Sequence, residues 1–222
     1  MSGAAEANDA MPARLQKSGR PSVAEAKALS RRILETAAGL FLEQGFRGTG
    51  TDQIAEAAGV TKRTLYARYP DKAALFEAAI TDAIDARLGA LELSIATGLD
   101  IRSRLIAISE SLLQWLLTDR NVAMERVVSS EALRFPELAR NIHAHGFNRA
   151  AAIVEHALSD ARQSGEIRLD DPEFAADYFT TAIVLSPFRR AGLGLAPVAL
   201  DDAGRARIRC AVDLFLDGCR KP

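Results

Sequence analysis

Residues 61–72, with the sequence TKRTLYARYPDK, bring cations and hydroxyl groups together in one short stretch. The charged members are four cations and one anion: Lys62, Arg63, Arg68, Lys72 and Asp71. Lysine, arginine and hydroxyl side chains donate hydrogen bonds to phosphate oxygens, and arginine also donates twice to the edge of guanine. The chemistry expected here is therefore the binding of DNA. A solvated helix face carries similar charges, so the cluster by itself leaves that alternative open.

The neighbouring residues have the spacing of two short helices that cross closely. Ala55, Gly59 and Leu65 stand four and six residues apart, which gives a small residue at the crossing, a glycine in the turn and an apolar residue beyond it. Gly59 suits the turn because glycine adopts the positive φ that strains other residues. The spacing predicts a helix-turn-helix with helices at about 52–58 and 62–68. The apolar residues expected to point inward are Ile54, Val60 and Leu65.

Two threonines stand where these helices begin. Thr51 precedes the first helix and Thr61 precedes the second. Threonine is a good N-cap because its hydroxyl accepts a hydrogen bond from an otherwise unpaired backbone amide. Both residues are therefore expected to cap.

Residues 30–76 closely resemble the TetR family of bacterial transcriptional regulators. The positions that match the family pattern are Ala37, Phe41, Gly45, Phe46, Thr49, Thr51, Ile54, Ala55, Gly59, Val60, Leu65, Tyr66, Pro70, Lys72 and Leu75. Three small departures are Tyr69 in place of the commoner Phe, Arg63 in place of Gly, and Gly50 in place of a small polar residue. None affects the expected fold, but Arg63 changes the surface offered to DNA. Residues 125–197 are more loosely similar to the AefR-like C-terminal domain of one TetR/AcrR-type branch.

This resemblance implies a DNA-binding role for the residues that start the second helix. A helix-turn-helix places that end in the major groove, where side chains reach base edges. Arg63 is the candidate for reading a guanine, with phosphate contact as the alternative, and Thr64 is small enough to touch a thymine methyl group. The remaining candidates for DNA contact are Thr51, Thr61, Lys62, Tyr66 and Lys72. The family favours a phosphate contact for Tyr66, whose alternative is a place in the core.

The whole chain is expected to be all-α, with about nine helices and no strand-like alternation. A capping-box pattern, Ser22 followed by Glu25, starts a helix that ends at Gly45-Phe46. Residues 1–21 are expected to form a disordered tail, residues 22–76 the head, and residues 77–222 a helical effector-binding and dimerisation domain. The helices expected after the helix-turn-helix span about 71–93, 100–117, 121–133, 136–163, 172–187 and 202–218.

Net charge and hydropathy limit the cellular location and the binding partner that can be expected. The net charge of the 222 residues is −1, with +2 over residues 1–80 and −3 over the remainder. This asymmetry is weak, but it has the sign expected for a DNA-binding head. No apolar run is long enough for a membrane span. The start of the chain lacks the apolar region of a secretory signal. A cytoplasmic location is therefore expected.

One recognition helix reads only a few base pairs, so the function implies a homodimer with two heads on a palindromic operator. Apolar stripes on the last two helices are the expected interface. Their candidate residues are Phe174, Tyr178, Ile183, Ile208, Val212 and Phe215. For each residue, burial within the subunit is an equal alternative.

The resemblance also implies a small-molecule effector that binds between the middle helices and moves the helix after the head. The candidate pocket residues are Trp115, Met124, Arg126, Phe147 and Phe179. Such apolar residues are more often simply core. The effector, the operator and the choice between repression and activation do not follow from the sequence, although repression is the usual mode of the family.

Catalysis and metal binding have no support in the sequence. The three histidines, His143, His145 and His156, do not share a face at metal-ligand distance. Cys210 and Cys219 are nine residues apart in one expected helix, too far for a disulfide. No nucleophile elbow or phosphate-cradling loop is present, so neither an enzyme nor a cofactor is expected. Two other classes remain, an architectural or cell-division DNA-binding protein of the same fold, and a ligand carrier that has lost DNA binding.

Overall fold

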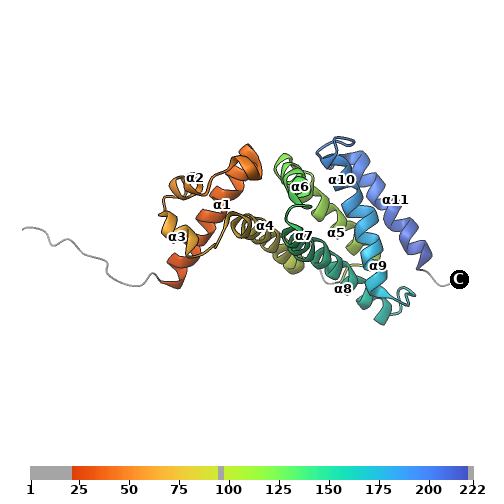
Figure 1. Ribbon diagram of the computed structural model, residues 1–222. Helices are drawn as coiled ribbons and strands as arrows, with labels where there is room; N and C mark the ends of the chain where they lie inside the picture. Colours follow the sequence, from red (N-terminus) through yellow and green to blue (C-terminus); the bar gives the residue numbers. More distant parts are fainter. Residues whose placement is uncertain (1–21, 95–97, 220–222) are drawn as a thin grey trace, which may run out of the picture.

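The computed structural model describes residues 22–94 and 98–219, and every regular element in these residues is a helix (Figure 1). The expected tail, residues 1–21, lies outside the described residues. The helices are α1 (Val23–Gly48), α2 (Thr51–Ala57), α3 (Lys62–Tyr66), α4 (Lys72–Ser94), α5 (Ile101–Leu116), α6 (Asp119–Glu131), α7 (Pro136–His143), α8 (Arg149–Gln163), α9 (Pro172–Phe179), α10 (Ser186–Gly192) and α11 (Asp202–Gly218). Two π-helices, η1 (Ala144–Asn148) and η2 (Thr180–Leu185), join α7 to α8 and α9 to α10. The described residues therefore form nine continuous helices, and the expected all-α fold is confirmed.

The helices divide into a head and a body. The head consists of α1, α2 and α3 at one end of the molecule, the body of α5 to α11 at the other, and α4 runs from one to the other (Figure 1). The expected boundary at residues 76 and 77 falls inside α4. No helix in the described residues is long and apolar enough to cross a membrane.

Local sequence signals set the ends of α1 and α4. The Ser22 hydroxyl accepts a hydrogen bond from the Glu25 amide at 3.2 Å, and the Glu25 carboxylate accepts one from the Ser22 amide at 2.8 Å, which forms the expected capping box. Gly45 breaks α1 with a φ of 72°. At the start of α4, the Asp71 carboxylate accepts a hydrogen bond from the Ala74 amide at 2.8 Å.

Two local expectations were wrong. The N-cap of α2 is Gly50, and Thr51 is the first residue of the helix, so its hydroxyl is free to bond elsewhere. The helix expected to end at residue 187 continues through α10 to Gly192. Pro187 lies at the start of α10, directly after the widened turns of η2, where a residue without an N–H is tolerated.

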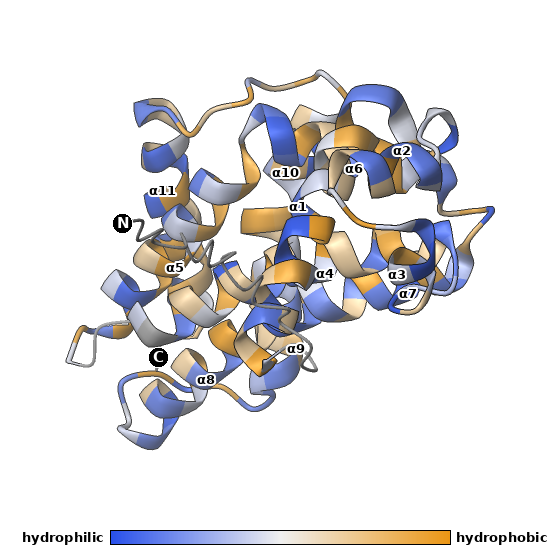
Figure 2. Cartoon of the chain, turned by 90° about the vertical axis from the view of Figure 1, so that its left-hand side faces the viewer, coloured by the Kyte–Doolittle hydropathy of each residue, from blue (hydrophilic) through white to orange (hydrophobic). Residues whose placement is uncertain are grey.

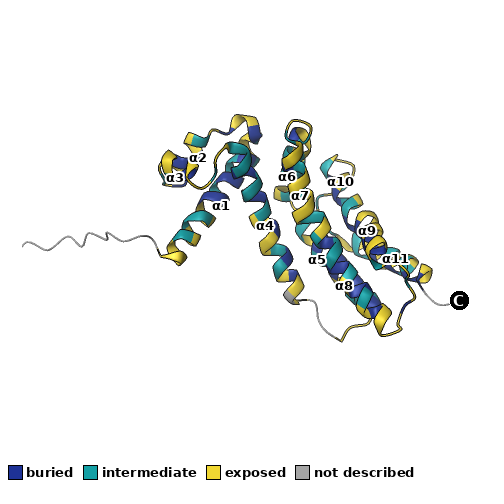
Figure 3. Cartoon of the chain, turned by 60° about the horizontal axis from the view of Figure 1, so that its bottom comes forward, coloured by how far each residue is buried: buried dark blue, intermediate teal, exposed yellow. Residues whose placement is uncertain are grey.

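Each helix has hydrophobic and hydrophilic residues along its length (Figure 2), and the buried residues are concentrated where helices meet, as along α5 and α8 (Figure 3).

An aromatic cluster connects the head to the body. Phe46 lies 5.2 Å from Phe76 of α4 and 5.2 Å from Phe135, which precedes α7, measured between ring centroids. Such contacts add packing energy beyond the buried area. The head is therefore packed against the body at the end of α1.

The structure separates the six candidate interface residues into two groups. Ile183, Ile208 and Val212 are buried inside the subunit, which is the alternative that the sequence left open. Phe215 is half-buried and packs edge-on against Phe179 at 5.1 Å. Only Phe174 and Tyr178 are exposed. The apolar residues of α9 and α11 occupy two faces of each helix, and the sequence did not indicate which face is inside.

Candidate nucleic-acid interface and ligand cavity

The turn between α2 and α3 has the geometry that its glycine predicts. Gly59 has a φ of 62°, and the Val60 amide donates to the Ala55 carbonyl at 2.9 Å across the turn. Ala55 and Leu65 are both buried. The angle between the two helices is therefore fixed by backbone conformation and by apolar packing.

A residue that the sequence did not single out closes the end of α2. Arg32 of α1 donates through Nε to the carbonyl of Ala58 at 3.0 Å. This carbonyl is among the last of α2, which have no partner within the helix. The arginine therefore connects α1 to the turn before α3, but one cation in an amphipathic helix gives no such signal in sequence.

The N-terminal end of α3 combines a cap with two exposed cationic residues. The Thr61 hydroxyl accepts a hydrogen bond from the Thr64 amide at 3.1 Å and lies 2.8 Å from the Thr64 hydroxyl, so Thr61 is the expected N-cap. Lys62 and Arg63 follow it and are exposed. The Arg63 side chain has no hydrogen bond or ion pair with any residue described by the structure. Its guanidinium is therefore available to an external acceptor.

Polar contacts join α2 to α3 beside this end. The hydroxyls of Thr51 and Tyr66 lie 3.0 Å apart. Lys62 Nζ lies 2.7 Å from Asp52 Oδ1 and 6.0 Å from the centroid of the Tyr66 ring. The hydrogen bond to Asp52 raises the pKa of Lys62, with the negative charge of Asp52 as the second cause. Lys62 therefore remains cationic and is held near the surface of both helices.

Lys72 has a different environment from the other candidate contacts. Its Nζ donates to the carbonyl of Phe46 at 2.8 Å and to the carbonyl of Thr49 at 3.0 Å, and lies 4.7 Å from the Phe46 ring centroid. The expectation was that its charge would attract phosphate. In the structure the ammonium group binds the carbonyls that follow the Gly45 break in α1, so it ties α4 to the head.

The body and α4 together form an apolar cavity of about 210 Å³. Trp115, Met124 and Phe147 line it, as expected. Two other candidates do not line it. Phe179 is in the core, and Arg126 is exposed and donates to the Gly192 carbonyl at 2.7 Å. Three of the five candidate residues therefore share this cavity, and their role in binding an effector stays a prediction.

Helix α4 forms a large part of this cavity. The residues that α4 contributes are Ala79, Ile80, Ala83, Ile84 and Leu88. The opposite wall includes Glu125 of α6, whose pKa is raised by burial. A molecule in this cavity would therefore contact the helix that continues from the head into the body.

Comparison with known proteins identifies the family of both parts. Residues 33–79 match the model of the bacterial regulatory proteins of the tetR family. Residues 103–218, just over half of the chain, match the C-terminal domain of AefR-like transcriptional repressors. The chain belongs to the TetR family. Its members bind DNA and regulate transcription, so this TetR-family protein is a DNA-binding transcriptional regulator and not an enzyme.

Individual relatives agree with this assignment. The flavonoid-responsive regulator FrrA has a structure with a TM-score of 0.69 and 30% identity, which covers 87% of this chain and 98% of that one. The uncharacterised regulator YvkB of Bacillus subtilis is 26% identical over 69% of this chain and 78% of its own length. The transcriptional activator FasR of Mycolicibacterium smegmatis is 30% identical, but the match spans only 40% of either chain.

The TetR fold also places the seven candidate DNA contacts. Six belong to α2, α3 or the cap of α3, and Lys72 starts α4. All seven lie within residues 33–79, the part of the chain that matches the tetR-family model. Asp52 and Arg32, which the sequence did not indicate, hold Lys62 and the turn in place.

Proposed function

We propose that the protein is a homodimeric repressor that binds a palindromic operator and leaves it when a small molecule fills the cavity of each subunit. The observation that carries the proposal is that α4 both lines the cavity and packs against α1 in the head. A ligand that displaces α4 therefore acts on the head directly. The match to AefR-like repressors favours repression, whereas the activator FasR is similar over the shorter match.

DNA recognition is assigned to the start of α3. Arg63 is proposed to read a guanine because its exposed guanidinium has a planar pair of donors that fits guanine O6 and N7. Thr64 is proposed to contact a thymine methyl group. Thr51, Thr61, Lys62 and Tyr66 are proposed to contact phosphates, which would set the position of the head on the duplex. In this scheme Lys72 acts mainly through the backbone carbonyls that it binds.

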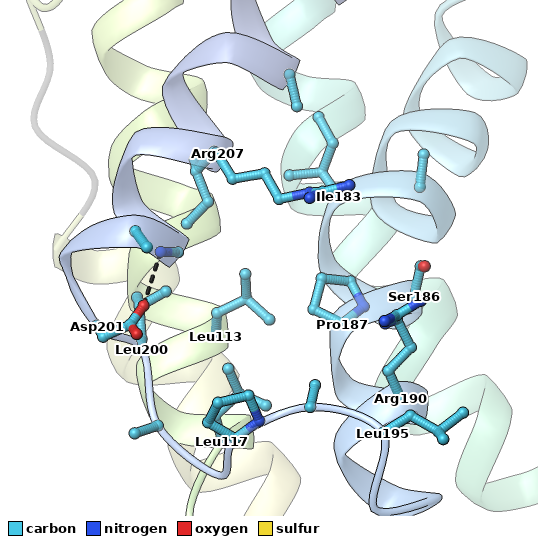
Figure 4. A pocket seen from close by; sticks show the side chains of 18 residues that line it. Leu113, Leu117, Ile183, Ser186, Pro187, Arg190, Leu195, Leu200, Asp201 and Arg207 are labelled. Carbon is cyan, nitrogen blue, oxygen red and sulfur yellow. Dashed lines mark hydrogen bonds between the residues drawn. The ribbon is translucent and has the colours of Figure 1, made fainter.

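The homodimer is assigned to the outer faces of α9, α10 and α11. Phe174 and Tyr178 of α9 and Leu214 of α11 are large apolar residues exposed on this side. A groove of about 560 Å³ lies between α10 and α11 (Figure 4). Leu113 of α5 and Leu117, the C-cap of α5, lie at its base, and Arg190 and Arg207 lie on its two sides. A two-fold four-helix contact would cover these residues and fill the groove with side chains of the second copy.

A second route connects the cavity to the head through α6. Met124 and Val128 of α6 line the cavity, and Glu131 at the end of the same helix forms an ion pair with Arg47 of α1. Movement of α6 would therefore change the position of α1. Both routes end in the head, which supports release by a change in the separation of the two heads.

Selection of purified full-length protein against random duplex DNA tests this function. We expect an enriched palindrome, bound by a dimer with a strong dependence on salt. Salt-dependent binding without an enriched sequence would instead support the architectural alternative, and no binding to any duplex would support the carrier alternative. FrrA is described as flavonoid-responsive, so aromatic compounds are the first class of effectors to add to the selected complex.

A further inference from the structure

One polar group in the wall of the cavity has no partner. Thr180, the first residue of η2, lines the cavity and is 1% exposed. Its hydroxyl has no hydrogen-bond partner among the residues that the structure describes. Leaving a buried hydroxyl unpaired costs free energy, because the group gives up its hydrogen bonds to water and gains none in return. A ligand oxygen next to Thr180 would remove that cost.

The rest of the cavity wall favours a flat, uncharged molecule. Trp115, Phe147 and Phe188 contribute aromatic rings, which stack on or meet other rings edge-on. The charged residues of the lining are one acid and one base, Glu125 and Arg120. Apart from these two residues and His143, the lining is uncharged and mostly apolar, so a charged ligand would lose much of its hydration on entry.

The size of the cavity limits the number of rings. An engineered cavity of about 150 Å³ in another protein binds benzene. The cavity here, at about 210 Å³, is somewhat larger than that one. A molecule of one or two rings therefore matches this volume.

We propose that the effector is an uncharged aromatic molecule of one or two rings whose hydroxyl or carbonyl oxygen pairs with the hydroxyl of Thr180. This inference rests on the proposed function, since it assigns the chemistry of the effector to the same cavity. Recognition then has two parts. The aromatic walls bind the ring, and Thr180 selects molecules that have an oxygen at the right position.

Calorimetry with three probes tests the inference on the full-length protein. The probes are 2-naphthol, naphthalene and 2-naphthoate, which share a ring system and differ in the oxygen and the charge. We expect 2-naphthol to bind most tightly and 2-naphthoate least. Thr180→Val should weaken the binding of 2-naphthol by about tenfold, because the variant removes the hydroxyl and keeps the shape of the side chain. The binding of naphthalene should be unchanged or slightly tighter. Thr180→Ser, which keeps the hydroxyl, should restore most of the affinity.

Thr181→Val is the matched control, since Thr181 is the next residue of η2 and is exposed. Equal effects of Thr180→Val on 2-naphthol and naphthalene would overturn the role of Thr180. Tightest binding of 2-naphthoate, or no binding of 2-naphthol, would overturn the proposed ligand class. DNA binding is measured separately. If 2-naphthol binds with the expected dependence on Thr180 but does not release the operator, the effector chemistry stands and the proposed release fails.

Discussion

Arg47 Nε lies 3.0 Å from Glu131 Oε1, and this ion pair joins the end of α1 to the end of α6 across 84 residues of sequence. The two side chains are in different environments, because Arg47 is 72% exposed and Glu131 only 7%. The second carboxylate oxygen of Glu131 is buried and has no partner among the described residues. The pair therefore depends on Arg47 to neutralise a buried charge.

The first prediction follows from this difference in burial. Arg47→Ala should lower the free energy of unfolding by about 2 kcal/mol, because it leaves the buried carboxylate without a counterion. Glu131→Gln should cost less than about 1 kcal/mol, since a neutral amide needs no counterion. In the double variant most of the Arg47→Ala loss should be recovered, as measured by urea denaturation. Arg140→Ala, which removes an exposed ion pair with Glu137, is the control. Equal losses for both single variants would contradict the prediction.

The second prediction concerns sequence preference. Arg63→Ala should reduce discrimination at one or two base pairs of each half-site by about tenfold, because it removes the proposed bidentate contact with guanine. Selection of the variant against random duplexes measures this change. Arg162→Ala, at an exposed arginine near the end of α8, is the control and should leave the selected sequence unaltered. A uniform loss of affinity with the same selected sequence would show that Arg63 contacts a phosphate and does not read a base.

The third prediction separates two roles of Lys72. Lys72→Ala should weaken binding to all duplexes alike and lower the midpoint of thermal unfolding, because the carbonyls of Phe46 and Thr49 lose their donor. The slope of log affinity against log salt should stay the same. If Lys72 instead neutralises a phosphate, the magnitude of this slope will decrease by about 1 in the variant. Anisotropy titrations at four salt concentrations distinguish these results.

The fourth prediction compares two glycines of the head. Gly59→Ala should destabilise the protein by about 1 kcal/mol, because alanine is strained at a positive φ. Gly39 lies within α1, and a Cβ added there meets no atom within 4 Å. Gly39→Ala should therefore stabilise the protein by about 0.5 kcal/mol. Chemical denaturation of the two variants gives effects of opposite sign if the turn geometry is correct.

The fifth prediction tests the proposed dimer face. Phe174→Glu and Leu214→Glu should each weaken dimerisation by about 30-fold or more, because each places a charge in an apolar contact. Sedimentation across a concentration series measures the effect. Leu133→Glu is the control, since Leu133 is fully exposed between α6 and α7, away from this face. If neither Phe174→Glu nor Leu214→Glu changes the affinity of dimerisation, the interface lies elsewhere.

The sequence by itself determined the head in detail. The capping box at Ser22, the cap at Thr61 and the positive φ of Gly59 all depend on residues a few positions apart, and local spacing specifies such contacts. The same holds for the order of the nine helices, which follows from periodicity and from caps. The family resemblance then extended the local pattern to DNA binding.

Only the tertiary structure decided which side of each body helix is inside. Helices α9 and α11 have apolar residues on two faces, so Ile208 and Phe174 were both candidates for the interface. Packing placed Ile208 in the core and left Phe174 exposed. The role of Lys72 depends on carbonyls 23 and 26 residues away, and that of Glu131 on an arginine 84 residues away. The unpaired hydroxyl of Thr180 likewise results from how six continuous helices surround one cavity. Contacts between distant residues arise from packing, and helical periodicity contains no information about them.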